Sequence, residues 1–311
     1  MTVWVKRLLP VFCCITGIMF PSAVLRADVY EAGAEEESGY PQAQRFGGKE
    51  VMEAFALGYP GRVEQSGFRN GDWGVKVDGV WFLFAEGRLL PESVATDPGT
   101  NLAEYAPYPF YRYTKTLPPI RRLDDDARRR INERLASREK TPPYRHPGLF
   151  NAIWRMDSRQ AAWERMKTTF FFGKKLLVHR DILEDLAGVE EEILDLAKTD
   201  AEVRSYVDSV ASATGFNYRP IAGTASLSFH SYGFAIDLTP ASYRGKEVYW
   251  RWAWDRNDEW FSLPYEKRYM IPERVVDIWE RHGFVWGGKW FFFDSMHFEY
   301  RPEILLLNGI N

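Results

Sequence analysis

Two segments near the C-terminal end of the chain constrain its fold most, because each places a histidine and an aspartate inside an otherwise apolar run. The first extends from Ser228 to Leu238 and the second from Gly287 to Tyr300. Alternate residues of a strand share a face, so Gly233, Ala235 and Asp237 would point to the same side. A carboxylate buried on that face is costly unless a cation or a hydrogen-bond donor meets it. We therefore expect the fold to bring a partner to this aspartate.

His230, in the first segment, has the wrong parity to share the face of Asp237 on a straight strand. We expect a turn at residues 231–233 to bring its imidazole round, with Gly233 supplying the backbone freedom that a tight turn needs. The residues of opposite parity are apolar and are expected to face a core; they are Phe234, Ile236 and Leu238. The segment thus predicts a turn followed by a buried strand with one polar face.

The second segment carries Asp294 and His297 in a very apolar run. A turn between them would set the carboxylate near the imidazole. Taken over both segments, two histidines and one aspartate make three ligands for a tetrahedral zinc and leave the fourth position open for water. An open position is typical of a catalytic site, where the metal lowers the pKa of bound water to about 7 and a further carboxylate can take its proton.

The pattern S-x-H-x-x-G-x-A-x-D, followed by W-x-x-x-D-x-x-H-F-E, resembles the zinc D-alanyl-D-alanine carboxypeptidases of the vancomycin-resistance D,D-peptidase type. It is also similar to the L-alanyl-D-glutamate endopeptidases of bacteriophage lysis enzymes. These families share the fold of the hedgehog signalling domain, so the resemblance implies that fold here. It covers residues 215–302 and implies a zinc peptidase that acts on the stem peptides of peptidoglycan.

The resemblance also implies roles for individual residues. By position in the motifs, the Zn²⁺ ligands would be His230, Asp237 and His297. The acid/base carboxylate of the family lies three residues before the last histidine, which is Asp294 in this chain. An arginine at the end of an upstream strand helps to hold the substrate in these families, and Arg219 takes that place.

Three alternatives stay open. The D,D-dipeptidases generally carry glutamate where this chain has Asp294, and aspartate is more usual in the L-alanyl-D-glutamate branch, so an endopeptidase is the alternative activity. A non-catalytic wall-binding module that keeps zinc for structure is the alternative from another class. Glu299 either supports His297 from behind or is exposed.

The elements expected along the chain indicate an α+β fold with a small antiparallel sheet flanked by helices. Asp78-Gly79 between two apolar runs predicts a tight hairpin. Helices are expected at Leu123–Lys140, Val189–Lys198, Ala201–Ala213 and Pro272–His282, and strands at Phe216–Tyr218 and Phe234–Leu238. We place a boundary between an N-terminal extension of unknown role, residues 28–149, and a zinc peptidase domain, residues 150–311.

Residues 1–27 read as a secretory signal, with Lys6 and Arg7 ahead of an apolar run. Pro and Gly interrupt that run, which favours cleavage over an uncleaved membrane anchor. Both cysteines, Cys13 and Cys14, lie in this segment. The mature chain would then hold a metal by histidine and carboxylate alone. We expect an exported protein of the periplasm or cell envelope, without stable membrane insertion after cleavage.

The charge balance points away from polyanionic partners. The chain has 40 basic and 43 acidic side chains, a net charge of −3. This near balance gives no reason to expect nucleic acid as a partner. The aromatic stretch 249–261 would either line a substrate cleft or pack a long loop onto the core, and we favour packing.

Overall fold

The computed structural model describes residues 46–108, 112–120, 123–140, 144–221, 224–257 and 259–310. The expected signal segment at 1–27, with Cys13 and Cys14, lies outside these ranges. The described chain combines helices with small antiparallel sheets, which confirms the predicted α+β class. None of the helices in the described ranges has both the length and the apolarity that crossing a bilayer requires.

The sheet that carries both motif segments has four strands in the order β7-β8-β10-β9. Its strands are β7 (Val210–Thr214), β8 (Ala235–Pro240), β9 (Phe284–Trp286) and β10 (His297–Tyr300), and each neighbouring pair is antiparallel. The register places His297 directly opposite Asp237 and Glu299 opposite Ala235. Residues that face each other across a pair point to the same side. One face of the sheet is therefore polar, as the parity of β8 predicts.

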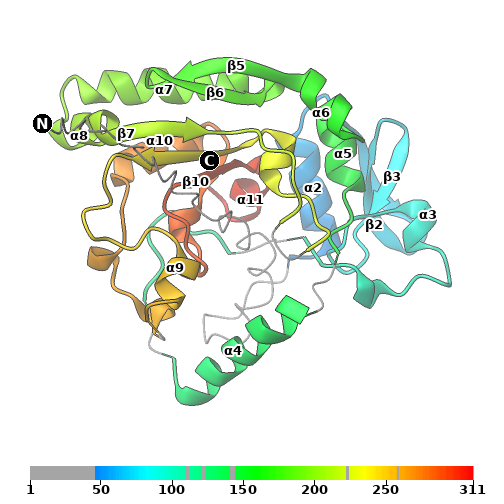
Figure 1. Ribbon diagram of the computed structural model, residues 1–311. Helices are drawn as coiled ribbons and strands as arrows, with labels where there is room; N and C mark the ends of the chain where they lie inside the picture. Colours follow the sequence, from blue (N-terminus) through cyan, green and yellow to red (C-terminus); the bar gives the residue numbers. More distant parts are fainter. Residues whose placement is uncertain are drawn as a thin grey trace, which may run out of the picture.

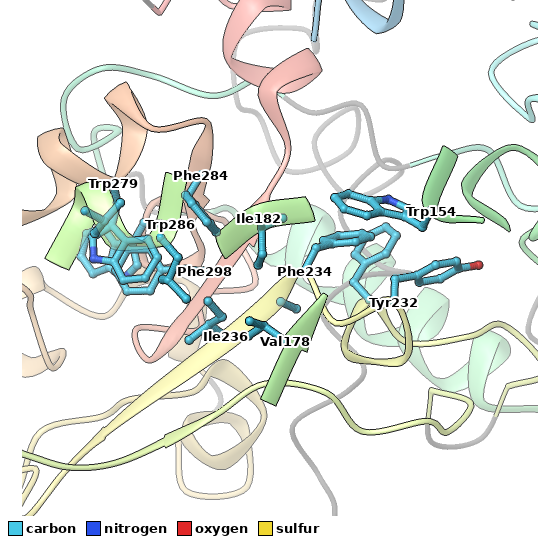
Figure 2. Packing of buried hydrophobic residues seen from close by; sticks show 14 of the residues in the cluster. Trp154, Val178, Ile182, Tyr232, Phe234, Ile236, Trp279, Phe284, Trp286 and Phe298 are labelled. Atoms are coloured by element: carbon cyan, nitrogen blue, oxygen red, sulfur yellow. The ribbon is translucent and has the colours of Figure 1, made fainter. Parts of the chain in front are cut away.

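The other face of the sheet packs into the hydrophobic core (Figure 2). Trp279, from α10 (Glu273–Arg281), stacks on Phe298 with ring centroids 4.2 Å apart. Ile236 lies on the same side of β8 and is fully buried. α7 (Leu183–Ala197) adds a second apolar helix to this layer and contacts α10. The apolar parity of the motif strands thus supplies the core that holds the polar face in place.

The N-terminal part is a helix followed by a second four-stranded sheet, on the right in Figure 1. Its elements are α2 (Gly48–Gly58), β1 (Val63–Arg69), β2 (Asp72–Val77), β3 (Val80–Leu83), β4 (Leu90–Pro91) and the short α3 (Glu92–Ala95). Val77 pairs with Val80 around Asp78 and Gly79, which have φ angles of 47° and 78°. Both angles are positive, as a tight hairpin turn between twisted strands needs. The predicted hairpin is confirmed.

The N-terminal part and the motif sheet share one hydrophobic core. α2 packs against α11 (Pro302–Leu307), the helix that follows β10. α5 (Gly148–Trp154) spans the predicted boundary at 149/150 and places Trp154 against Phe234 of the first motif segment, with ring centroids 4.7 Å apart. The boundary stays a prediction, but the two sides of it are packed together.

The remaining elements lie around the motif sheet and the N-terminal part. They are α4 (Asp125–Lys140), α6 (Arg159–Arg165), β5 (Met166–Phe171), β6 (Lys174–His179), α8 (Ala201–Ser209) and α9 (Trp250–Trp254). A second aromatic core lies under α4 and α9, where Trp250 and Trp260 are fully buried and Ile131 of α4 joins them. These tryptophans pack a long loop onto the protein, so the packing interpretation of the aromatic stretch is confirmed.

One stretch of the sequence was predicted wrongly. The helix expected at Ala201–Ala213 ends at Ser209, and Val210–Thr214 forms β7, whereas residues 216–218, expected as a strand, have no regular structure. Val-Ala-Ser-Ala-Thr has no strong preference for either state. The open edge of β8 decides, because pairing with it satisfies the backbone of this segment. Tertiary pairing here overrides a weak helical spacing.

Candidate metal centre

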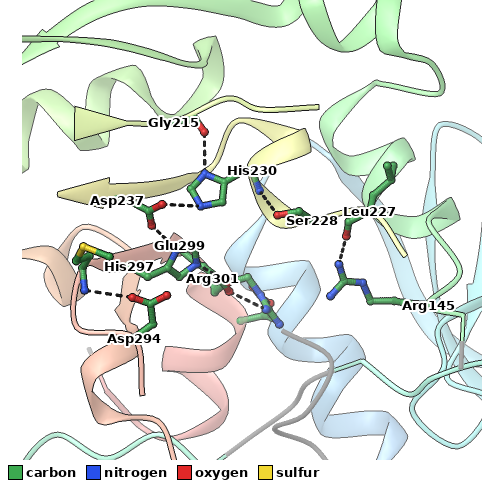
Figure 3. A network of polar contacts seen from close by, with 12 residues as sticks. Arg145, Gly215, Leu227, Ser228, His230, Asp237, Asp294, His297, Glu299 and Arg301 are labelled. Carbon is green, nitrogen blue, oxygen red and sulfur yellow. Dashed lines mark hydrogen bonds and ion pairs between the residues drawn. The ribbon is translucent and has the colours of Figure 1, made fainter. Parts of the chain in front are cut away.

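The turn before β8 delivers His230 to the polar face of the sheet (Figure 3). His230 lies in the 3₁₀ turn η3 (Phe229–Tyr232), and Gly233 ends this turn with a φ of 73°. The Oγ of Ser228 accepts a hydrogen bond from the backbone N–H of His230 at 3.2 Å. The Nδ1 of His230 lies 2.7 Å from the carbonyl oxygen of Gly215, which makes Nδ1 the protonated nitrogen. The predicted turn, with glycine as its hinge, is confirmed.

The register of β8 and β10 brings Asp237 and His297 together. His297 Nδ1 lies 2.7 Å from Asp237 Oδ1, across the β8–β10 pair. Nε2 of His230 faces the second oxygen of the same carboxylate, 3.3 Å from Oδ2. The donor atoms of the three residues all lie within 4.8 Å of one another, and all three residues are buried. The structure therefore brings together the two motif segments at one carboxylate.

Glu299 contacts the ring nitrogen of His297 that faces away from Asp237. Its Oε1 lies 2.9 Å from Nε2 of His297, and the residue is only 1% exposed. Of the two interpretations left open for Glu299, the structure favours support of the imidazole over exposure. Each histidine thus has one ring nitrogen held by an oxygen acceptor and the other directed to Asp237, the pattern that metal-binding histidines adopt.

The electrostatics of the group favour a cation among these side chains. Burial raises the pKa of Asp237, but His230 and His297 together outweigh burial and hold that pKa well below its usual range. Burial lowers the pKa of His297, but hydrogen bonds to Asp237 and Glu299 outweigh it and raise the pKa well above its usual value. Positive charge is therefore stabilised between the two carboxylates.

The donor set fits a zinc ion. Nε2 of His230 is buried and lies 3.3 Å from Asp237 Oδ2. Because Nδ1 carries the proton, Nε2 turns its lone pair toward a carboxylate oxygen of Asp237, and a cation between the two atoms would satisfy both. Two imidazoles and one carboxylate are ligands that zinc takes, and three protein ligands leave one position for water or substrate.

Asp294 is buried next to this group, at the turn that leads into β10. Its Oδ1 accepts a hydrogen bond from the backbone N–H of Met296 at 3.3 Å, and its carbonyl accepts one from the N–H of His297. Burial raises the pKa of the Tyr243 hydroxyl, and the charge of Asp294 raises it further. The predicted turn between Asp294 and His297 is present, and the carboxylate caps it.

Arg219 is attached to the same turn as His230 through its backbone. Its N–H donates to Ser231 Oγ at 2.9 Å, and its carbonyl accepts from that hydroxyl at 2.8 Å. The side chain is half-buried. Arg219 is outside the group whose donor atoms converge on Asp237, so its role as a substrate anchor stays a prediction.

The cleft around Tyr243 has none of the metal-ligand candidates in its lining. It has a volume of about 330 Å³ and is lined by α8 and by the segments that follow β8 and α9. Tyr243 contributes to its wall and also places its hydroxyl 3.0 Å from Sδ of Met296, the residue before His297. Both Asp294 and Asp237 raise the pKa of Tyr243. Tyr243 therefore connects the wall of the cleft to Met296, the residue before His297.

Three further buried polar residues continue from Glu299. Arg301 and Glu303 are fully buried, and Glu303 Oε2 accepts a hydrogen bond from the hydroxyl of Tyr59 at 2.7 Å. Sequence reasoning missed all three. A pattern was present for two of them, because polar residues alternate from His297 to Glu303, although β10 ends at Tyr300 and Glu303 lies in α11. Nothing local to Tyr59 indicates its partner, which is 244 residues away.

Comparison with family models finds a match over the segment that carries this site. Residues 222–300 match the model described as D-alanyl-D-alanine carboxypeptidase, and the match includes both motif segments. Residues 51–110 match a model described as a domain of unknown function. Searches among curated proteins and among solved structures find no match to the chain. The first match confirms the family resemblance, and with it the presence of a peptidase domain.

Proposed function

We propose that this chain is an exported zinc D-alanyl-D-alanine carboxypeptidase that acts on the stem peptides of peptidoglycan. The observation that carries the proposal is the buried group of His230, Asp237 and His297, whose donor atoms converge inside the segment that matches the carboxypeptidase model. The proposed ligands of Zn²⁺ are these three residues. Zinc bound there would polarise the scissile carbonyl and lower the pKa of a water molecule.

The chain's own residues supply the proton transfers and the orientation. Asp294 is the proposed general base, which takes a proton from the attacking water and later gives it to the leaving amine. Its buried place beside His297 and its fixed hydrogen bond to Met296 support this role, because they hold the carboxylate in one orientation. Arg219, held by Ser231, is the proposed anchor for a carboxylate or carbonyl oxygen of the substrate.

The cleft beside Tyr243 is the proposed path of the peptide. Its wall includes the cations Arg244 and Lys246 as well as tyrosine rings. The wall also includes the carboxylates Glu202 and Glu266, so such a groove offers partners for both charged groups and the apolar side chains of a stem peptide. Nucleic acid is not proposed as a partner, because the overall charge is slightly negative.

A second activity deserves a test because of one residue. In the resembling families, aspartate at the position of Asp294 is more usual in the L-alanyl-D-glutamate branch. An endopeptidase that cuts beside D-glutamate would use the same proposed ligands and differ only in where the peptide lies in the cleft. A third outcome is a wall-binding module that holds zinc without cleaving.

Digestion of purified muropeptides by the exported form distinguishes these functions. The products are read by mass spectrometry with no addition, with a chelator, and with chelator followed by excess zinc. Loss of a single D-alanine that stops with chelator and returns with zinc is the expected result. Cleavage between L-alanine and D-glutamate would establish the endopeptidase instead. Intact muropeptides in the presence of zinc-loaded protein would contradict both enzymatic proposals.

A further inference from the structure

We propose that Arg301, together with Glu303 and Tyr59, positions the metal centre. Tyr59 directly follows the N-terminal helix α2, so this part of the chain would contribute to metal binding by the peptidase. The inference rests on the proposed function in one respect, namely that His297 is a metal ligand. It assigns a role to side chains that lie beyond Glu299, one of them in the segment that matches the domain of unknown function.

The contacts form an unbroken chain of buried side chains, and Figure 3 shows the part from His297 to Arg301. His297 Nε2 meets Glu299 Oε1 at 2.9 Å, and the second oxygen of Glu299 accepts from Arg301 Nη1 at 3.3 Å. Nε of Arg301 donates to Glu303 Oε1, and Oε2 of Glu303 accepts from the Tyr59 hydroxyl at 2.7 Å. The side chains of Glu299, Arg301 and Glu303 are at most 2% exposed.

Arg301 fixes the rotation of the Glu299 carboxylate. Because one oxygen of Glu299 is bound to the guanidinium, the other is left directed at the imidazole. A carboxylate in that orientation sets which ring nitrogen of His297 carries the proton and leaves Nδ1 for Asp237 or a metal. Without the guanidinium, Glu299 would be a buried carboxylate with one partner fewer, and its orientation toward the imidazole would be less restrained.

The same guanidinium also contacts the turn that carries the other histidine. Arg301 lies over the ring of Phe229 at 4.9 Å and near that of Phe150 at 5.7 Å. Phe229 begins η3 and is followed directly by His230. One buried cation therefore touches the support of both proposed imidazole ligands, through Glu299 on one side and through Phe229 on the other.

Tyr59 completes the network from the N-terminal part. Arg301 lies between two buried carboxylates, and the hydroxyl of Tyr59 gives Glu303 a further donor. Burial, and then the nearby Glu303, raise the pKa of Tyr59, so the hydroxyl keeps its proton. Removing one member of a buried charged network leaves another without compensation, which is costly.

The approach of α2 is close enough to make this contact specific. Gly58, the last residue of α2, lies beside the first turn of α11, where an added Cβ would be 3.1 Å from the backbone nitrogen of Glu303. Tyr59 follows at once. A side chain at 58 would require α2 or α11 to shift by a few tenths of an ångström at the place where Tyr59 meets Glu303.

The test measures zinc affinity on the full chain, by competition with a chromogenic chelator, and thermal unfolding of the metal-free protein. Arg301→Gln removes the cation, Arg301→Lys keeps a charge, and Tyr59→Phe removes only the outer hydroxyl. Tyr113→Phe is the matched control. Tyr113 also donates from the N-terminal half to a buried carboxylate, Glu280, at 2.6 Å, but that carboxylate pairs with Lys289 and not with the proposed metal ligands.

We expect Arg301→Gln to weaken zinc affinity about 10- to 100-fold, as loss of a supporting partner does in other metal sites, and Arg301→Lys to weaken it less. Tyr59→Phe should weaken it about threefold to tenfold. Tyr113→Phe should lower the unfolding temperature of the metal-free protein and leave zinc affinity unchanged. If Arg301→Gln does not fold, the contrast between the two tyrosine variants decides.

The outcomes separate this inference from the proposed function. Unchanged zinc affinity in the Arg301 and Tyr59 variants, with wild-type protein that binds zinc and cleaves, would overturn the positioning role alone. Zinc binding that depends on Arg301 and Tyr59 in a protein that cleaves nothing would support the positioning role and remove the enzymatic one. A wild-type chain that binds no zinc would overturn both.

Discussion

The two faces of β8 and β10 are equally buried and chemically opposite. On one face, Ile236 and Phe298 pack against Trp279, and on the other, Asp237 and His297 meet across the strand pair. The apolar face gains free energy from burial alone. Burial of the polar face costs desolvation free energy, which is offset only when every charge has a partner. The comparison teaches that the core face stabilises the fold, whereas the polar face depends on what completes it.

Two buried histidines make the same contrast at the level of one residue type. His179 donates from Nε2 to the carbonyl of Trp154 at 3.0 Å and accepts the N–H of Asp181 at Nδ1, so backbone groups satisfy it as a neutral ring. His297 lies between two carboxylates. Burial is similar, and the partners decide whether the site favours a neutral ring or a cation.

The largest expected effect is on the core face. Phe298→Ala should lower the free energy of unfolding by about 4 kcal/mol, because it removes a ring that stacks on Trp279 and leaves a cavity. Denaturant unfolding of the metal-free protein measures the loss. Zinc affinity of the folded fraction should stay near wild type, and a loss of affinity as large as that of a ligand variant would break the division between the faces.

On the polar face, Asp294→Asn should lower kcat/KM by about 100- to 1,000-fold, because an amide cannot take a proton from water. Asn keeps the oxygen that accepts from Met296, so the turn should be preserved. Muropeptide cleavage is followed together with zinc content. An Asp294→Asn protein with full zinc and full activity would show that this carboxylate is only a cap of the turn.

The pH dependence of stability sharpens the contrast between the histidines. Burial lowers the pKa of His179 to about 4. The unfolded chain, with an ordinary histidine pKa of about 6.5, therefore binds more protons between pH 4 and 6.5, and stability falls as the pH drops through that window. Over this pH window, protonation of His179 in the unfolded chain should lower the free energy of unfolding by roughly 3 kcal/mol.

The check compares unfolding of wild type and His179→Gln from pH 7 to pH 4. The groups that face this ring are Asp181, 3.8 Å from Nδ1, and Arg62, which pairs with that aspartate. The variant should lose less stability than wild type over the window. Parallel pH profiles for the two proteins would mean that His179 is not the group responsible.

The smallest effect expected is from metal itself. Zinc at a hundredfold excess over its Kd should raise the free energy of unfolding by about 2.7 kcal/mol, because it binds only the folded state. The same increment is expected in Phe298→Ala and none in Asp237→Asn, measured as the shift on adding zinc after chelation. A zinc shift that survives Asp237→Asn would place the metal elsewhere.

Much of the site could be predicted from the sequence because its information is local. The parity of Ala235 and Asp237 fixes a polar face, and Gly233 marks the turn that redirects His230. Residues this close along the chain are constrained by backbone geometry alone, which is also why the hairpin at Asp78-Gly79 was predicted correctly. The sequence by itself thus determined the two motif segments and the side chains that they present.

Only the tertiary structure decided which distant segments complete those strands. The register that sets Asp237 against His297 joins residues 60 apart, and β7 became a strand because β8 offered it an edge. The hydroxyl of Tyr59 reaches Glu303 from the other end of the chain. The physical reason is that pairing and burial of charge depend on the partner that packing supplies, and neither periodicity nor propensity carries that information.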